Sequence, residues 1–109
     1  DAYFFTSDAM VASQAELIID TAKAKKLPTV FHEQSLVARG GLASYGLSFH
    51  EIGRMSARYV HRILAGTHPR NLPVETVHRL ELAINLRTAR ELGLAVPREM
   101  LMRADKVIQ

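Results

Sequence analysis

Polar side chains follow three short apolar runs of this sequence, at the points where strands of a parallel sheet would end. They are Thr6, Ser7 and Asp8, then His32 and Glu33, then Ser44, Tyr45 and Gly46. Ligands of open α/β sheets bind beyond the carboxyl ends of the strands. Hydroxyl groups and a helix N-terminus can hold a carboxylate, a side-chain carboxylate can accept from an ammonium group, and a tyrosine adds an apolar ring with a polar tip. These residues could therefore contact a ligand at one edge of the sheet, although no motif among them identifies the ligand.

Each of these residues also has a structural alternative. Asp8, directly after a strand, is more often a helix cap than a ligand contact, and one carboxylate can do both. His32 and Glu33 could be ordinary loop residues. Tyr45 could either line a cleft or pack beneath the helix that follows it.

Patterns for catalysis or metal binding do not occur in the chain. It has no cysteine, so disulfides and thiolate metal sites are excluded, and its five histidines form no HExxH motif and no i, i+4 pair. A nucleophile elbow, a Walker loop and a GxGxxG turn are also missing. We therefore expect no enzymatic activity, no metal and no cofactor.

The charge is unevenly distributed over the 109 residues, which carry a net +3. Residues 1–47 hold five acidic and four basic side chains, and residues 48–109 hold six acidic and ten basic ones. A basic half can bind nucleic acid. Here the arginines are scattered among glutamates along predicted helix faces and are not bunched, so we expect a solvated surface and no nucleic-acid partner. The chain begins inside a predicted strand, without Met or an apolar leader, and we expect it to be part of a longer protein.

The elements that position these residues are alternating strands and helices. The expected elements are a strand at 2–6, a helix that begins between Ser7 and Ser13 and ends near Lys26, a strand at 28–31, a helical turn at 34–39, a strand at 42–45 and a helix at 48–66. Ser13 and Glu16 have the spacing of a capping box. This order predicts an α/β fold with a partial parallel sheet of about three βα units.

The last third of the chain reads as a tail of strand and helices. A loop at 67–73 precedes one or two extended segments within 74–86, and Asn85 is expected to cap a short helix that ends at Gly93. Pro97 should begin a final helix. Its expected buried stripe is Met100, Leu101, Ala104, Val107 and Ile108.

The stretch from Gly40 to Gly66 joins a strand to the longest predicted helix. Gly40 and Gly41 are expected to serve backbone geometry, and Gly46 to turn the chain before the Ser48 cap. One apolar or small stripe of the helix is Phe49, Ile52, Ser56, Tyr59, Val60 and Ile63. Arg54, Arg58, His61 and Arg62 lie off that stripe.

Four segments, in this order, resemble the C-terminal part of the ABC-transporter substrate-binding proteins of the type I periplasmic-binding-protein fold associated with amino-acid-like ligands. They are TSDAMVAS (6–13), KLPTVFHEQSLVARGGLASYGLSFHEIG (26–53), ILAGTHPRNLPVE (63–75) and LAINLRTARELGLAVPREMLMRADKVI (82–108). Members of that family often carry Asn directly after the Asp of the first strand end. This chain has Ala9 there, so a side-chain contact is missing and the ligand can differ.

The resemblance implies two lobes that close about a hinge on a solute, which is then passed to a membrane permease. Residues 1–45 would belong to the second lobe. Residues 46–73 would form a helix and loop that cross the hinge to the first lobe, and residues 74–109 would return from there to the second lobe. Gly40, Gly41 and Gly46 would be backbone positions of the hinge region. The protein would be periplasmic or otherwise extracytoplasmic, with membrane anchoring through its N-terminus left open.

Two alternatives remain open for the function. The same fold serves as the effector-binding domain of transcription regulators, and a small receiver-like or enzymatic α/β domain would need an acidic cluster at the strand ends. For the chain alone we expect a homodimer, because the sheet edges and the long helix lack partners, and exchange of the tail from Val74 onward is one way to form it. The apolar stripe of that helix is therefore expected to be buried.

Overall fold

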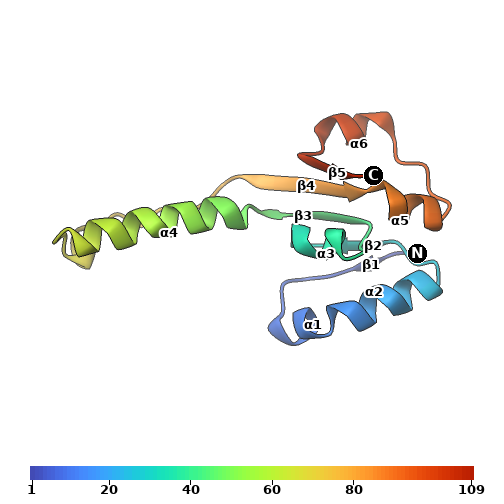
Figure 1. Ribbon diagram of the computed structural model, residues 1–109, viewed down its shortest axis with the longest axis horizontal. Coiled ribbons are helices and arrows are strands. Elements are labelled where there is room, and N and C mark those ends of the chain that lie inside the picture. Colours follow the sequence, from blue (N-terminus) through green and yellow to red (C-terminus); the bar gives the residue numbers. More distant parts are fainter. The chain divides into compact units, whose positions relative to one another are not determined.

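A five-stranded sheet in the order β1-β2-β3-β4-β5 organises the chain, in a computed structural model that describes all residues, 1–109 (Figure 1). The strands are β1 (Tyr3–Phe4), β2 (Thr29–Phe31), β3 (Ala43–Leu47), β4 (Leu80–Asn85) and β5 (Lys106–Ile108). The pairs β1–β2, β2–β3 and β4–β5 are parallel. The predicted α/β class, with a partial parallel sheet of about three βα units and a C-terminal strand, is confirmed, and β5 adds a further strand at residues predicted to be helical.

Strands β3 and β4 are neighbours that run in opposite directions. The N–H of Asn85 donates to the carbonyl of Leu42 at 2.8 Å, and the N–H of Ser48 donates to the carbonyl of Arg79 at 3.2 Å. Residue numbers rise along one strand as they fall along the other, which is the antiparallel pattern. The chain thus leaves through β3 and comes back through the adjacent strand.

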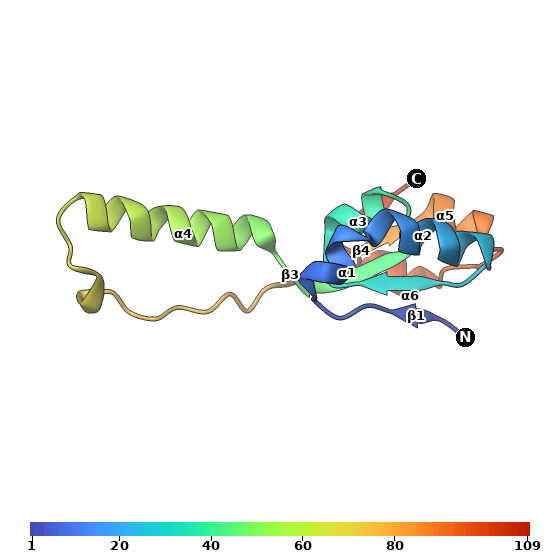
Figure 2. The same ribbon diagram turned by 90° about the horizontal axis from the view of Figure 1, so that it is seen from below.

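Two compact units result from this path. Unit 1 contains residues Asp1–Gly46 and Glu81–Gln109, and unit 2 contains Leu47–Leu80. The helices of unit 1 are α1 (Ala9–Ser13), α2 (Ala15–Ala24), α3 (Gln34–Ala38), α5 (Leu86–Glu91) and α6 (Arg98–Arg103). Figure 2 shows α2, α3 and α5 along one side of the sheet.

The core of unit 1 lies between the first strands and their helices. Its main cluster is Phe5, Ala15, Ile19, Phe31 and Leu36, each no more than 3% exposed. The rings of Phe5 and Phe31 lie 5.5 Å apart between centroids. Removing such aromatic and aliphatic area from water is the main source of stability for a unit of this size.

The first predicted helix is interrupted, and the capping box is wrong. The helix is divided at Gln14 into α1 and α2, and Asp8 caps α1 by accepting from the N–H groups of Met10 and Val11. Ser13 is the last residue of α1, where its hydroxyl donates to the carbonyl of Met10 at 2.6 Å, and α2 begins after Gln14 without a side-chain cap. The predicted cap at Asn85 is confirmed.

The final predicted helix is too long. It ends at Arg103, and Val107 and Ile108 lie in β5 rather than on a helical stripe. Asp105 explains the change: its N–H donates to the carbonyl of Leu82 at 2.8 Å, and its carboxylate accepts from the N–H of Leu82 at 2.9 Å. These two bonds attach the C-terminal residues to β4 as a further parallel strand.

Unit 2 is built on one long helix, α4 (Phe49–Leu64), capped by Ser48 as predicted. The short 3₁₀ helix η1 (Pro69–Asn71) follows, and residues 72–79 return outside any helix or strand, with the carbonyl of Arg79 accepting from the N–H of Ser48. Tyr59 donates a hydrogen bond to the carbonyl of Pro73, and Arg58 pairs with Glu75 at 3.6 Å. These contacts hold the returning segment beside the helix.

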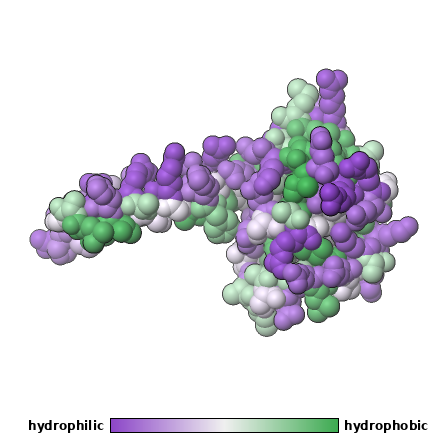
Figure 3. All heavy atoms as spheres, viewed as in Figure 1, coloured by the Kyte–Doolittle hydropathy of each residue, from purple (hydrophilic) through white to green (hydrophobic).

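The apolar stripe of α4 is not buried, contrary to the prediction. No residue of the helix is buried, and Phe49 and Val60 are each 56% exposed. A groove of about 510 Å³ lies along the helix, lined mainly by Leu47, Ile52, Met55, Ser56, Tyr59, Val60 and Val77. In Figure 3 apolar residues gather on one side of α4 and hydrophilic ones on the other. Only the returning segment of unit 2 covers part of the apolar side.

Candidate functional site

The carboxyl ends of β1, β2 and β3 come together in unit 1. In the parallel register Phe4 lies opposite Val30, and Val30 opposite Ala43. Continuing each strand by two residues brings Thr6, His32 and Tyr45 to the same level. The N–H of Phe5 donates to the carbonyl of Val30 at 2.9 Å, which continues the pairing toward that edge. The polar groups predicted from the sequence therefore share one edge of the sheet.

Asp8 lies at the first of these ends and acts as a helix cap. Its Oδ1 accepts from the N–H groups of Met10 at 2.9 Å and Val11 at 3.1 Å. Both bonds use the same oxygen, so Oδ2 can still accept from a ligand. Thr6, Ser7 and Asp8 are all exposed. The capping alternative is thus realised, and it leaves a ligand role open.

His32 and Glu33 form the second end. The His32 ring is stacked on Phe5, with centroids 5.5 Å apart and planes 12° from parallel, and its Nδ1 is buried without a hydrogen-bond partner. Glu33 precedes α3 but does not cap it through its side chain; it accepts a hydrogen bond from the hydroxyl of Ser35 instead. Phe5 fixes the plane of His32, a support that the run AYFFT did not reveal.

Tyr45 and Gly46 belong to the third end. Tyr45 is 59% exposed, so its ring is not packed beneath a helix, whereas Ser44 beside it is 2% exposed. Gly46 lies inside β3 and does not turn the chain, which corrects the prediction. A Cβ at Gly46 would come 2.0 Å from the carbonyl oxygen of His32. Glycine is required there because two backbone segments touch.

The glycine pair before β3 has a backbone function of its own. Gly40 has a φ of +118°, in the region that disfavours other residues. A Cβ at Gly41 would come 2.5 Å from the Phe31 ring. The pair therefore lets the chain turn tightly against the core before it enters β3.

The composition of this edge suits binding rather than reaction. Hydroxyls, two carboxylates, an imidazole and an exposed phenol lie at three adjacent strand ends, and no nucleophile–base pair is found among them. No group of three or more potential metal ligands gathers anywhere in the structure. None of the helices combines the length and the apolar character needed to cross a bilayer.

Comparison with known proteins gives the family. The family model described as "ABC transporter substrate binding protein" matches residues 1–108, almost the whole chain. This chain belongs to that family. The resemblance predicted from the four sequence segments is confirmed.

Individual relatives agree with this assignment. The chain is 24% identical over 94 residues to a tyrosine-binding protein of Clostridioides difficile, covering 86% of this chain and 27% of the relative. It is 36% identical to a conserved domain protein from Vibrio cholerae, with a TM-score of 0.88 over 98% of this chain and 36% of that one. An ABC domain from Streptococcus pneumoniae in complex with L-Trp is 29% identical, with a TM-score of 0.89 over 99% of this chain and 37% of that one.

The relatives named above are longer than the present chain. It spans about a quarter of the curated relative and a little over a third of the two solved structures. What those proteins bind as whole molecules is therefore a matter of proposal for this chain.

Proposed function

We propose that this protein binds a small amino-acid-like solute for an ABC import system and carries out no reaction on it. The observation that carries the proposal is the edge of unit 1, where three parallel strands end in carboxylates, hydroxyls and an exposed aromatic ring. Family membership supports solute binding. One relative is named a tyrosine-binding protein and another is an ABC domain in complex with L-Trp, which supports an amino acid as the class of solute.

The chemistry of an amino acid fits the groups available at this edge. Asp8 through Oδ2 and Glu33 can accept from its ammonium group. The hydroxyls of Thr6 and Ser7 can donate to its carboxylate, and the exposed ring of Tyr45 can pack on its side chain. His32, held flat by Phe5, adds a polar contact on the middle strand. Ala9 offers no polar side-chain atom, so the solute is expected to be held without an amide at that position.

We propose that the solute is enclosed by two lobes that close about a hinge. In this arrangement residues 1–45 belong to the second lobe, residues 46–73 cross to the first lobe, and residues 74–109 return. The boundaries of the compact units at Gly46/Leu47 and Leu80/Glu81 support a crossing of this kind. The exposed stripe of α4 would then pack in the first lobe, and in the isolated chain a second copy could cover it. The protein would act outside the cytoplasm, beside its permease.

The decisive experiment is a solute panel on the full-length protein. Thermal unfolding and calorimetry are run with the twenty amino acids, with amines that lack the carboxylate and with acids that lack the ammonium group. We expect some amino acids to raise Tm, because a ligand at 100 times its Kd stabilises the bound form by about 2.7 kcal/mol. Both sets of truncated analogues should fail. If none of the twenty amino acids raises Tm or gives a binding signal in calorimetry, the proposed solute class is rejected.

Asp8→Asn separates the capping role of Asp8 from its role in binding. Asparagine caps helices about as well as aspartate, so α1 should persist, but the negative charge for the ammonium group is lost. We expect solute affinity to fall at least about tenfold with little change in Tm, because charged hydrogen bonds contribute about 1.5–3 kcal/mol. Asp20→Asn, an equal change of charge on an exposed residue of α2, is the matched control. If the two variants bind the solute with equal affinity, Asp8 does not take part in binding.

A further inference from the structure

The net positive charge of the chain is concentrated in unit 2. Between Leu47 and Leu80 there are five arginines and two glutamates, a net of +3, which equals the net charge of the whole chain. The rest of the molecule is neutral overall. Unit 2 contains no lysine, so its basic residues are arginines and histidines only. The four lysines of the chain all lie in unit 1: Lys23, Lys25, Lys26 and Lys106.

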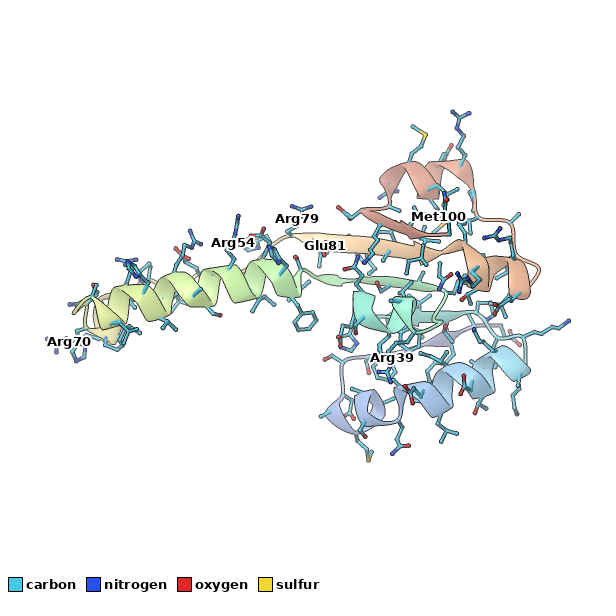
Figure 4. All side chains as sticks on the ribbon, viewed as in Figure 1. Arg39, Arg54, Arg70, Arg79, Glu81 and Met100 are labelled. Atoms are coloured by element: carbon cyan, nitrogen blue, oxygen red, sulfur yellow. The ribbon has the colours of Figure 1, made fainter.

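Helical geometry brings most of these residues to one face of α4. With 3.6 residues per turn, five basic side chains fall within an arc of about 120° directly opposite the apolar stripe. We call this set the arginine face: His50, Arg54, Arg58, His61 and Arg62. Glu51 is the only acidic residue within the arc. Figure 4 shows Arg54 projecting outward from α4.

The acidic residues of unit 2 do not neutralise this face. Glu51 pairs with Arg54 at 3.0 Å and Glu75 pairs with Arg58 at 3.6 Å, and both arginine side chains remain 69% exposed. These are the two glutamates of the unit, and Arg62 adds an exposed guanidinium beyond them. A face made for solvation alone usually mixes both signs of charge.

We propose that the arginine face docks on an acidic surface of the membrane permease. The choice of this partner rests on the proposed function. Guanidinium groups bind carboxylates through two parallel hydrogen bonds and lose less hydration than ammonium groups. Protein interfaces are accordingly enriched in arginine and depleted in lysine. The exclusive use of arginine in unit 2 matches that preference.

The returning segment favours a protein over a lipid surface. A helix that lies on a bilayer carries its cationic side chains on the polar face and buries its apolar face at the boundary between headgroups and acyl chains. In unit 2 the returning segment, attached through Tyr59 and Glu75, covers part of the apolar side of α4, so this side is not free to enter a bilayer.

The test compares two double charge reversals in the full-length protein. Arg54→Glu with Arg62→Glu alters the arginine face, and Arg98→Glu with Arg103→Glu makes the same change of charge on exposed residues of α6 in unit 1. Binding to the purified permease is measured in nanodiscs of neutral lipid and of lipid with 30% phosphatidylglycerol. Solute affinity and Tm are measured alongside.

We expect the first pair to weaken permease binding at least about tenfold and to reduce its salt dependence, while solute affinity stays unchanged. The α6 pair should change permease binding less than threefold. Equal effects of the two pairs, or no effect of either, would overturn the inference, and so would binding to anionic nanodiscs without permease that the first pair abolishes. A wild-type protein that binds no amino acid would instead count against the proposed function.

Discussion

Replacing Gly46 by alanine is expected to lower the free energy of unfolding by about 3 kcal/mol, the upper end of the usual cost of overpacking. The added Cβ would stand 2.0 Å from the carbonyl oxygen of His32, far inside contact distance. Both atoms belong to strand backbone, so neither can rotate away as a side chain would. The strand ends at His32 and Tyr45 would have to separate. Urea unfolding followed by circular dichroism measures the loss.

A glycine in the other unit provides the control. Gly53 lies inside α4, and a Cβ there would meet nothing within 4 Å. Gly53→Ala should therefore stabilise the helix by about 0.5–1 kcal/mol, because alanine loses less backbone freedom on folding. Opposite signs for the two variants are the expected result. A Gly46→Ala protein as stable as the parent would show that the backbone at His32 is not held in this position.

Asn85→Ala is expected to cost about 2–4 kcal/mol, through two losses at one buried side chain. Asn85 is 4% exposed, and its Oδ1 accepts from the N–H groups of Arg87 at 3.0 Å and Thr88 at 3.1 Å. Its Nδ2 donates to the carbonyl of Val37 at 2.9 Å. Losing a cap costs about 1 kcal/mol, and leaving buried polar groups unpaired costs about 1–3 kcal/mol more. The same unfolding measurement applies.

Two further variants separate these losses. Asp8→Ala also removes a cap, but from an exposed helix start where water can replace it, so about 0.5–1 kcal/mol is expected. Asn85→Ser keeps a capping oxygen for α5 without adding a charge and removes the donor to Val37, so its cost should lie between the other two. If Asn85→Ala is no worse than Asp8→Ala, the bond to Val37 contributes nothing.

Local chemistry was sufficient to predict much of unit 1. Parallel strands place their carboxyl ends at one edge, so the grouping of Thr6, His32 and Tyr45 followed from the order of the elements alone. The caps at Ser48 and Asn85 are confirmed because a cap depends on its own side chain and the next three residues. These features are encoded within short stretches of sequence.

The errors concern contacts between residues distant in sequence. Val107 and Ile108 fit a helical stripe by spacing, but they form β5 because Asp105 binds Leu82, 23 residues earlier. The sequence predicts a turn at Gly46, but glycine is needed there because the backbone of His32 lies against it. The stripe of α4 shows that a residue can be patterned for burial and yet remain exposed in this chain. Spacing alone contains no information about which surface covers an apolar face.

The antiparallel pairing of β3 with β4 makes unit 2 topologically an insertion. The chain departs at Leu47 and re-enters at Leu80 on the neighbouring strand, so both ends of the inserted segment lie side by side. Such a segment can be exchanged for an Asn-Gly hairpin turn, which closes adjacent antiparallel strands. A chain shortened in this way would keep β1, β2 and β5 whole and would trim β3 and β4 by one residue each. The binding edge could then be carried by a minimal scaffold about two-thirds as long.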